Sequence, residues 1–136
     1  MDPDGQDLVA QSLTKVFGAG DTAVEAVRDA SLSVRAGEFV AIVGPSGSGK
    51  TTLLAMLGGL LTATSGRVIV GSTDISRLNE AQRARFRRER VGFVFQGFNL
   101  VPYLTAEQNL LVIPSISGKV SAETRARARQ LLQELI

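Results

Sequence analysis

A glycine-rich segment, GPSGSGKTT at residues 44–52, separates two apolar runs in the first half of this chain. The preceding run, EFVAIV at residues 38–43, is short, rich in β-branched residues and almost wholly apolar, which predicts a strand buried on both faces. The following run, residues 50–61, is too long for a strand and contains no proline, which predicts a helix buried against a sheet. A strand, a glycine loop and a helix in this order indicate an α/β fold.

The glycine-rich segment matches the phosphate-binding pattern G-x-x-x-x-G-K-[ST] in full. Its glycines let successive backbone N–H groups turn toward an anion, and the positive end of the following helix strengthens the attraction. We expect Lys50 to reach the β- and γ-phosphates of a nucleotide, the Thr51 hydroxyl to bind Mg²⁺, and Thr52 to contact the α-phosphate side. The expected nucleotide-binding residues of the loop are Gly44, Pro45, Ser46, Gly47, Ser48, Gly49, Lys50, Thr51 and Thr52.

The rest of the chain alternates between strand-like and helix-like patterns. The other expected strands are residues 8–17, 23–34, 66–75 and 91–95, and the other expected helices are residues 79–89, 105–113 and 121–136. The first two strands are joined by a turn containing Gly18, Gly20 and Asp21, so we expect them to form an antiparallel pair. The order of the remaining elements predicts a three-layer α/β domain with a parallel core.

Two helix starts carry capping signals. Thr105 with Gln108 three residues later fits a capping box, and Ser121 fits the N-cap of the final helix. That final helix presents an apolar stripe that no following segment covers, which predicts a truncated domain. The stripe consists of Leu131, Leu132, Leu135 and Ile136.

Composition excludes several chemistries and destinations. The sequence contains no cysteine and no histidine, which removes thiolate and imidazole metal sites and an imidazole general base. The start, MDPDGQD, is acidic where a secretory signal is basic, so we do not expect export. The most apolar stretch, residues 53–61, is about half the ~20 residues that a membrane-spanning helix needs.

Three stretches of the sequence resemble the ATP-binding cassette (ABC) subunit of membrane transporters. GEFVAIVGPSGSGKTTLL at residues 37–54 resembles the Walker A region of that family. RVGFVFQGFNLVPYLTAEQNL at residues 90–110 resembles its Q-loop region, and LTKVFGAGDTAVEAVRDASLSV at residues 13–34 resembles the segment that carries an aromatic A-loop residue. Within the family, FVFQGFNLVPYLTA most resembles the lipoprotein-releasing and macrolide-exporting type.

The resemblance implies a fold, cofactors and two further site residues. It implies a P-loop NTPase fold in which residues 8–37 form an antiparallel β region, 38–103 the core up to the Q-loop, and 104–136 the start of a helical subdomain. Phe17 would stack on the adenine of ATP, although tyrosine is commoner at this position. Gln96 would reach Mg²⁺ or the attacking water. Gln108 replaces a glutamate that is frequent in the family, and both residues suit a capping box.

The resemblance also implies partners and a location. The partners would be a transmembrane permease and a second nucleotide-binding domain in a head-to-tail dimer, at the cytoplasmic face of the membrane. The family's signature sequence, its Walker B acids and its switch histidine follow the Q-loop. This sequence has no Ser-Gly-Gly run, no histidine, and no apolar strand that ends in Asp-Glu. The chain is therefore expected to bind ATP and not to hydrolyse it alone.

Three other functions remain open at the level of sequence. The glycine loop also occurs in P-loop phosphotransferases. The absence of the Walker B acids would equally suit a regulatory module that binds a nucleotide without hydrolysing it. Residues 77–90 hold six arginines against two acids, which raises the possibility of nucleic-acid binding. The arginines fall on more than one face of the expected helix and aromatic residues are few, so we expect a solvated helix and no nucleic-acid partner.

Overall fold

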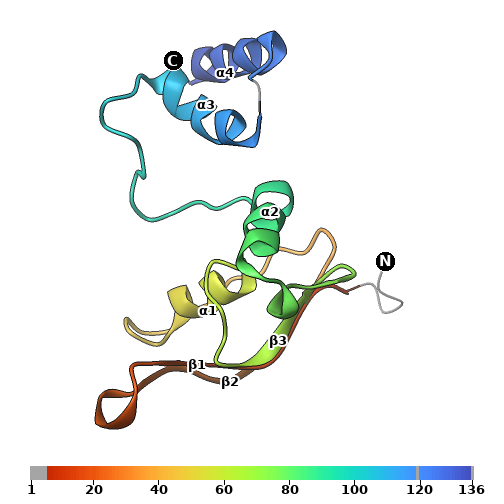
Figure 1. The fold of residues 1–136 in the computed structure, drawn as a ribbon, viewed down its shortest axis with the longest axis vertical. Helices are drawn as coiled ribbons and strands as arrows, with labels where there is room; N and C mark the ends of the chain where they lie inside the picture. Colours follow the sequence, from red (N-terminus) through yellow and green to blue (C-terminus); the bar gives the residue numbers. More distant parts are fainter. Residues whose placement is uncertain (1–5, 119, 136) are drawn as a thin grey trace. The chain divides into compact units, whose positions relative to one another are not determined.

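The computed structural model describes residues 6–118 and 120–135, so that residues 1–5, Lys119 and Ile136 lie outside the described part of the chain. The chain divides into two compact units between Val91 and Gly92. The described strands are β1 Gln6–Phe17, β2 Val24–Arg35, β3 Ser65–Val70 and β4 Thr73–Asp74. The described helices are α1 Lys50–Leu57, α2 Glu80–Arg90, α3 Ala106–Ser117 and α4 Ala122–Glu134, with the short 3-10 helices η1 Gly20–Thr22 and η2 Ile75–Arg77 (Figure 1).

The strands of the first unit form one antiparallel sheet in the order β2-β1-β3-β4. The long β1–β2 hairpin confirms the predicted antiparallel pair. Its turn requires glycine at position 18, because φ is 76° and a Cβ there would lie 2.7 Å from the carbonyl oxygen of Thr22. The predicted strand at residues 66–75 is instead a tight hairpin, since β3 and β4 pair with each other on either side of Gly71 and Ser72.

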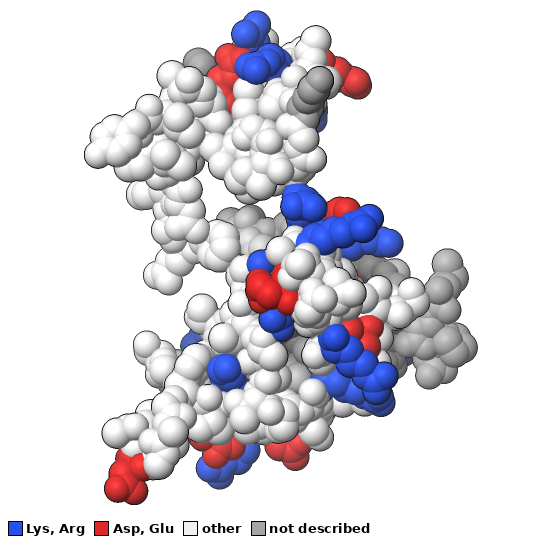
Figure 2. Space-filling view, in the orientation of Figure 1, with Lys and Arg blue, Asp and Glu red and all other residues white. Residues whose placement is uncertain are grey.

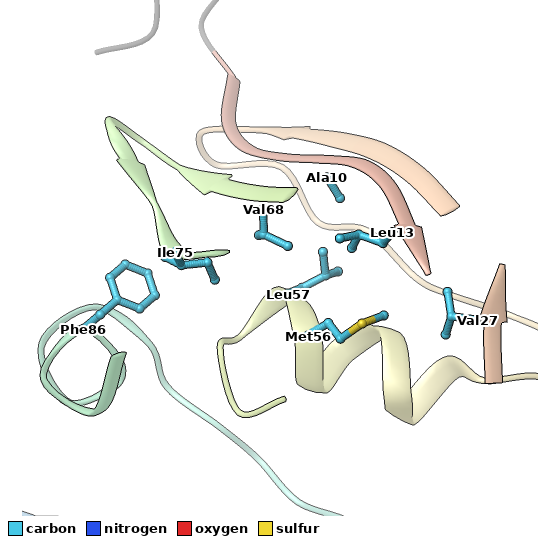
Figure 3. Packing of buried hydrophobic residues seen from close by; sticks show 8 residues of the cluster. All are labelled: Ala10, Leu13, Val27, Met56, Leu57, Val68, Ile75 and Phe86. Carbon is cyan, nitrogen blue, oxygen red and sulfur yellow. The ribbon is translucent and has the colours of Figure 1, made fainter. Parts of the chain in front are cut away.

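The core of the first unit lies between the sheet and the two helices α1 and α2. Leu57 of α1 points toward Leu13 and Val68 of the sheet, and Met56 belongs to the same buried cluster (Figure 3). Phe86 of α2 extends the same cluster. Full burial of a leucine or methionine side chain stabilises a fold by about 1.5–3 kcal/mol, so packing on the sheet holds α1 in place.

Helix α1 ends four residues before the predicted end, at Leu57. The amide of Leu60 donates to the carbonyl oxygen of Ala55 at 2.8 Å, and the amide of Gly59 donates to that of Met56 at 3.0 Å. With Gly59 at a φ of 70°, this is a Schellman motif. The apolar pattern continues beyond the helix, but the paired glycines terminate it.

Helix α2 confirms the predicted polar helix. Asn79 caps it through a capping box with Gln82. Arg87 Nη1 donates a hydrogen bond of 2.8 Å to the carbonyl oxygen of Gly59, which connects α2 to the end of α1. Both Arg83 and Arg87 form ion pairs with Glu80, at 2.7 and 3.3 Å. Basic side chains gather over α2 in the space-filling view (Figure 2), and part of their charge is balanced within the helix itself.

The prediction of buried strands at residues 38–43 and 91–95 is wrong for this structure. A parallel strand obtains its hydrogen bonds from neighbouring strands, and among the described residues no strand pairs with either segment. Phe39 is 94% exposed and Val94 is fully exposed. The predicted three-layer arrangement with a parallel core is therefore not present in the described residues, whose sheet is antiparallel throughout.

The second unit contains α3 and α4, which contact each other; the buried residue of α3 is Leu111 and that of α4 is Ala128. Thr105 and Gln108 form both hydrogen bonds of the predicted capping box, and Ser121 caps α4, so both predicted helix starts are confirmed. Helix α3 continues past its predicted end near residue 113 and includes Pro114.

The apolar stripe of α4 behaves largely as the sequence predicts. Leu131 is 37% exposed, Leu135 is 83% exposed and Leu132 is half-buried, whereas Ile136 lies outside the described residues. Over residues 6–118 and 120–135, no helix is both long enough and apolar enough to cross a bilayer.

Candidate nucleotide-binding site

The glycine-rich loop occupies residues 44–49 and leads directly into α1, whose first residue is Lys50. Gly49 is the N-cap of the helix and has a left-handed φ of 84°. The first backbone N–H groups of a helix have no intrahelical acceptor, and the helix dipole places partial positive charge there. The loop and the first turn of α1 therefore form a concave surface suited to an anion.

Strand β2 fixes the position of this loop. A Cβ on Gly49 would lie 2.1 Å from the carbonyl oxygen of Ala26 and 3.2 Å from Cγ2 of Val27. Val27 pairs with Lys15 of β1, and Ala26 lies between the paired residues Glu25 and Val27, so the sheet holds β2 on both sides of this contact. The close backbone contact means that only glycine fits at position 49.

Lys50 lies across the loop. Its Nζ donates hydrogen bonds to the carbonyl oxygens of Gly44 at 2.9 Å and Pro45 at 2.7 Å, and a third, longer one to Ser48 Oγ at 3.4 Å. An ammonium group has three donors and no acceptor, so these three contacts direct its donors onto the loop. The amide of Ser48 also donates to the carbonyl oxygen of Pro45 at 3.3 Å, which closes the turn.

An open cavity of about 540 Å³ lies between the loop and β2. This volume is in the range of small-molecule sites in proteins. Its charged lining residues are Glu25, Arg28 and Lys50. Arg28 Nη2 donates to Glu25 Oε2 at 2.7 Å, and this bond lowers the pKa of the Glu25 carboxyl and raises the pKa of Arg28. The carboxylate is thus paired, and the lining carries a net positive charge from Lys50.

The structure brings most of the predicted loop residues together around this cavity. Gly44, Pro45, Gly47, Ser48, Gly49 and Lys50 line it. Thr51 and Thr52 occupy the first turn of α1, where Thr51 is exposed and Thr52 half-buried. Ser46 is exposed at the tip of the loop.

Phe17 is not among the residues that line the cavity. It ends β1, is 43% exposed, and pairs with Val24 in the β1–β2 register. Val27, which contacts the loop at Gly49, lies three residues further along β2. Phe17 therefore lies on the β1–β2 strand pair that the loop contacts, about 10 Å along the strand from that contact.

Gln96 belongs to the second unit, in a segment without regular secondary structure that precedes α3. Its side chain is exposed. Phe93 and Phe95 stack nearby in the sequence, with ring centroids 5.6 Å apart. The structure thus groups Gln96 with the second unit and the glycine loop with the first.

The sequence analysis did not identify three side chains, two in the cavity and one beside the segment that precedes α3. Glu25 and Arg28 line the cavity, and Asn109 binds the backbone before α3. Asn109 Oδ1 accepts from the amide of Val101 at 2.8 Å, and its Nδ2 donates to the carbonyl oxygen of Leu104 at 3.1 Å. No sequence pattern marks these residues: strict strand alternation would place Glu25 and Arg28 on opposite faces of β2, and an asparagine within a helix carries no signal of its own.

No cluster of three or more acidic, histidine or cysteine side chains that could hold a metal occurs within the described ranges. A cation beside the glycine loop would draw its protein ligands from hydroxyl oxygens, such as that of Thr51 on the first turn of α1. Hydroxyl ligands accord with a magnesium ion that keeps most of its coordination with phosphates and water.

Comparison with known proteins agrees with the geometry. The sequence profile of the ABC transporter family matches residues 27–136. The macrolide export ATP-binding/permease protein MacB of Brucella abortus is 47% identical over 125 residues, which cover 92% of this chain and 19% of that protein. The lipoprotein-releasing system ATP-binding protein LolD 2 of Rhodospirillum rubrum is 50% identical over 126 residues, which cover 90% of this chain and 54% of that protein.

A solved structure has the same fold. It is the dimeric post-hydrolysis state of the ATP-binding cassette MJ0796 bound to ADP and Pi, with a TM-score of 0.84 and 36% identity, and the match covers 93% of this chain and 56% of that one. The chain spans about half the length of the single-cassette relatives, and a fifth of the macrolide-export relative. The chain belongs to the ABC transporter family, and it corresponds to the amino-terminal part of an ATP-binding domain.

Proposed function

We propose that this chain binds MgATP through residues 44–52 as part of the energy-coupling subunit of an ABC transporter. The observation that carries the proposal is the position of Lys50. Its ammonium group is held at 2.7–2.9 Å from two loop carbonyl oxygens, beside the free amides at the start of α1. A positive charge and a helix N-terminus at one open cavity suit a polyphosphate.

The residues present fit both ATP and Mg²⁺. The open face of the loop leaves room for phosphates, and the contact of Gly49 with β2 keeps that face in place. Thr51, exposed on the first turn of α1, would bind Mg²⁺. The role of Gln96 as a second oxygen ligand is proposed from the sequence resemblance alone. When bound, the ion would neutralise charge on the outer phosphates.

The chain is proposed to bind ATP without hydrolysing it. Hydrolysis in P-loop proteins needs an acid that holds Mg²⁺ and a group that orients the attacking water. Among the described residues that line the cavity, Glu25 is the one carboxylate, and it forms an ion pair with Arg28. A bound but intact nucleotide would suit either a part of a larger transporter subunit or a regulatory module.

The family also suggests partners. One relative is named an ATP-binding/permease protein, and a solved relative is described as dimeric. By analogy we propose that this chain acts with a transmembrane permease and a second nucleotide-binding domain, at the cytoplasmic face of the membrane.

ATP titration by calorimetry, with and without Mg²⁺, tests the binding proposal. The Lys50→Ala variant should bind ATP about tenfold or more weakly, as expected for loss of a hydrogen-bonded charge. Arg67→Met is a matched control, because Arg67 is an exposed basic residue on β3 that contacts Gln11 and does not line the cavity. Equal ATP affinity of the wild-type and Lys50→Ala chains would contradict the proposal, and steady phosphate release by the purified chain would contradict the absence of hydrolysis.

A further inference from the structure

Lys15, which does not line the cavity beside the glycine loop, makes two contacts through its ammonium group. Its Nζ lies 5.1 Å from the centroid of the Phe17 ring, within the range of a cation–π interaction. The same Nζ donates a hydrogen bond of 2.9 Å to the carbonyl oxygen of Thr62. One ammonium group therefore joins the end of β1 to the segment between α1 and β3.

The segment that anchors Lys15 is itself fixed to β1. The amide of Thr64 donates to the carbonyl oxygen of Thr14 at 2.8 Å, and the amide of Val16 donates to Thr64 Oγ1 at 3.0 Å. Because these bonds flank Lys15 on the strand, the Thr62 carbonyl is held at a constant position relative to it. Lys15 is thus attached at both ends, by its own backbone and by its ammonium group.

The strand register relates this arrangement to the glycine loop. Lys15 lies opposite Val27, which contacts the loop at Gly49, whereas Phe17 lies opposite Val24. Three strand residues span about 10 Å, a distance that a nucleoside triphosphate covers between its base and its outer phosphates. A nucleoside triphosphate whose phosphates bind at the loop is therefore long enough for its base to reach the end of β1.

We propose that Lys15 is a positioning residue for the base-binding ring of Phe17, an inference that rests on the proposed ATP binding. The ammonium group occupies one side of the ring and restricts its rotation, while the ring stays 43% exposed. A purine then stacks on the side that Lys15 does not cover. Fixing the ring before binding lowers the entropic cost of stacking.

Comparison of ATP with inorganic tripolyphosphate tests this role in the full chain, because tripolyphosphate lacks a base. Lys15→Met keeps the apolar stem and removes the charge, and it should weaken ATP binding about two- to fivefold. Tripolyphosphate affinity should not change. Lys15→Arg should restore ATP binding, since a guanidinium group can make both contacts. Arg67→Met again serves as the control for loss of an exposed basic residue from the sheet.

A double-mutant cycle identifies the ring as the route of the effect. In a Phe17→Leu background, Lys15→Met should no longer alter ATP affinity. The proposal is overturned if Lys15→Met leaves ATP affinity unchanged or raises it, if ATP and tripolyphosphate weaken equally, or if the effect persists without the ring. If the wild-type chain binds neither ligand, the proposed function itself fails and this inference with it.

Discussion

The backbone of Gly49 contacts that of Ala26 so closely that any side chain at position 49 would collide with a strand carbonyl, at 2.1 Å. The glycine-rich loop is therefore positioned by a contact between two main chains, and side-chain rearrangement cannot relieve a substitution at position 49. This contact leads to the first prediction.

Gly49→Ala should destabilise the first unit by about 2–5 kcal/mol, because left-handed strain adds to steric overlap with β2. Gly47→Ala is the matched control, since Gly47 also has a positive φ, of 79°, but has open space around its Cα. Gly47→Ala should lower the free energy of unfolding only by the left-handed backbone strain, about 1–2 kcal/mol. Urea unfolding monitored by circular dichroism measures both values, and equal losses would show that the Ala26 contact does not matter.

Lys50→Arg should not restore ATP binding lost in Lys50→Ala. The lysine ammonium meets two carbonyl oxygens, of Gly44 and Pro45, as a compact charge. A planar guanidinium has fixed donor directions and a larger head, so it cannot take the same position. We expect ATP affinity to remain about tenfold or more below that of the wild type, measured by calorimetry. Wild-type affinity in the arginine variant would mean that charge alone is sufficient.

The stability of the first unit should fall at acidic pH in part through Glu80. Hydrogen bonds from Arg83, and then from Arg87, lower the pKa of the Glu80 carboxyl from 4.5. A lowered folded-state pKa contributes stability that is present above pH 4.5 and is lost as the pH falls through the folded value. Glu80→Gln should therefore reduce stability at pH 7 and flatten its dependence on pH below 4.5.

Thermal unfolding from pH 7 to pH 3 tests this dependence. Glu89→Gln is the comparison, because Glu89 pairs with Arg85 as an exposed i,i+4 pair on the same helix, and such pairs add little stability. If both variants lose the same stability at every pH, the shared position of Glu80 between two arginines has no special effect.

Asn109 should order the backbone that precedes α3. Its Oδ1 accepts from the amide of Val101, and its Nδ2 donates to the carbonyl oxygens of Leu104 and Thr105. Asn109→Ala should speed hydrogen exchange at the Val101 amide by about five- to tenfold, as expected for loss of one net hydrogen bond. Asn109→Asp keeps the acceptor and should preserve that protection. Unchanged exchange in the alanine variant would show that the turn holds without the side chain.

Sequence patterns predicted the elements whose partners lie close by in the chain. The β1–β2 hairpin, the start of α1 at Lys50 and the capping box of Thr105 all depend on local turn and cap chemistry. Residues 38–43 show the limit of this reasoning. Their apolar pattern indicates burial, but it does not state which strand would pair with them, and no described strand does.

The candidate site shows the same division. The motif identified the loop residues, because their spacing alone specifies the backbone they need. The sequence did not indicate that Arg28 lines the cavity or that Lys15 covers Phe17. Those positions follow from the strand register, which long-range pairing determines.

Helix α1 is held at both of its ends, at Gly49 by β2 and at Gly59 by the Arg87 side chain. With eight residues it is only about 12 Å long, too short to bend appreciably. A ligand that displaced the loop would therefore have to move the helix as one piece against its packing on the sheet, and this movement would lengthen the Arg87 hydrogen bond that joins the end of α1 to α2.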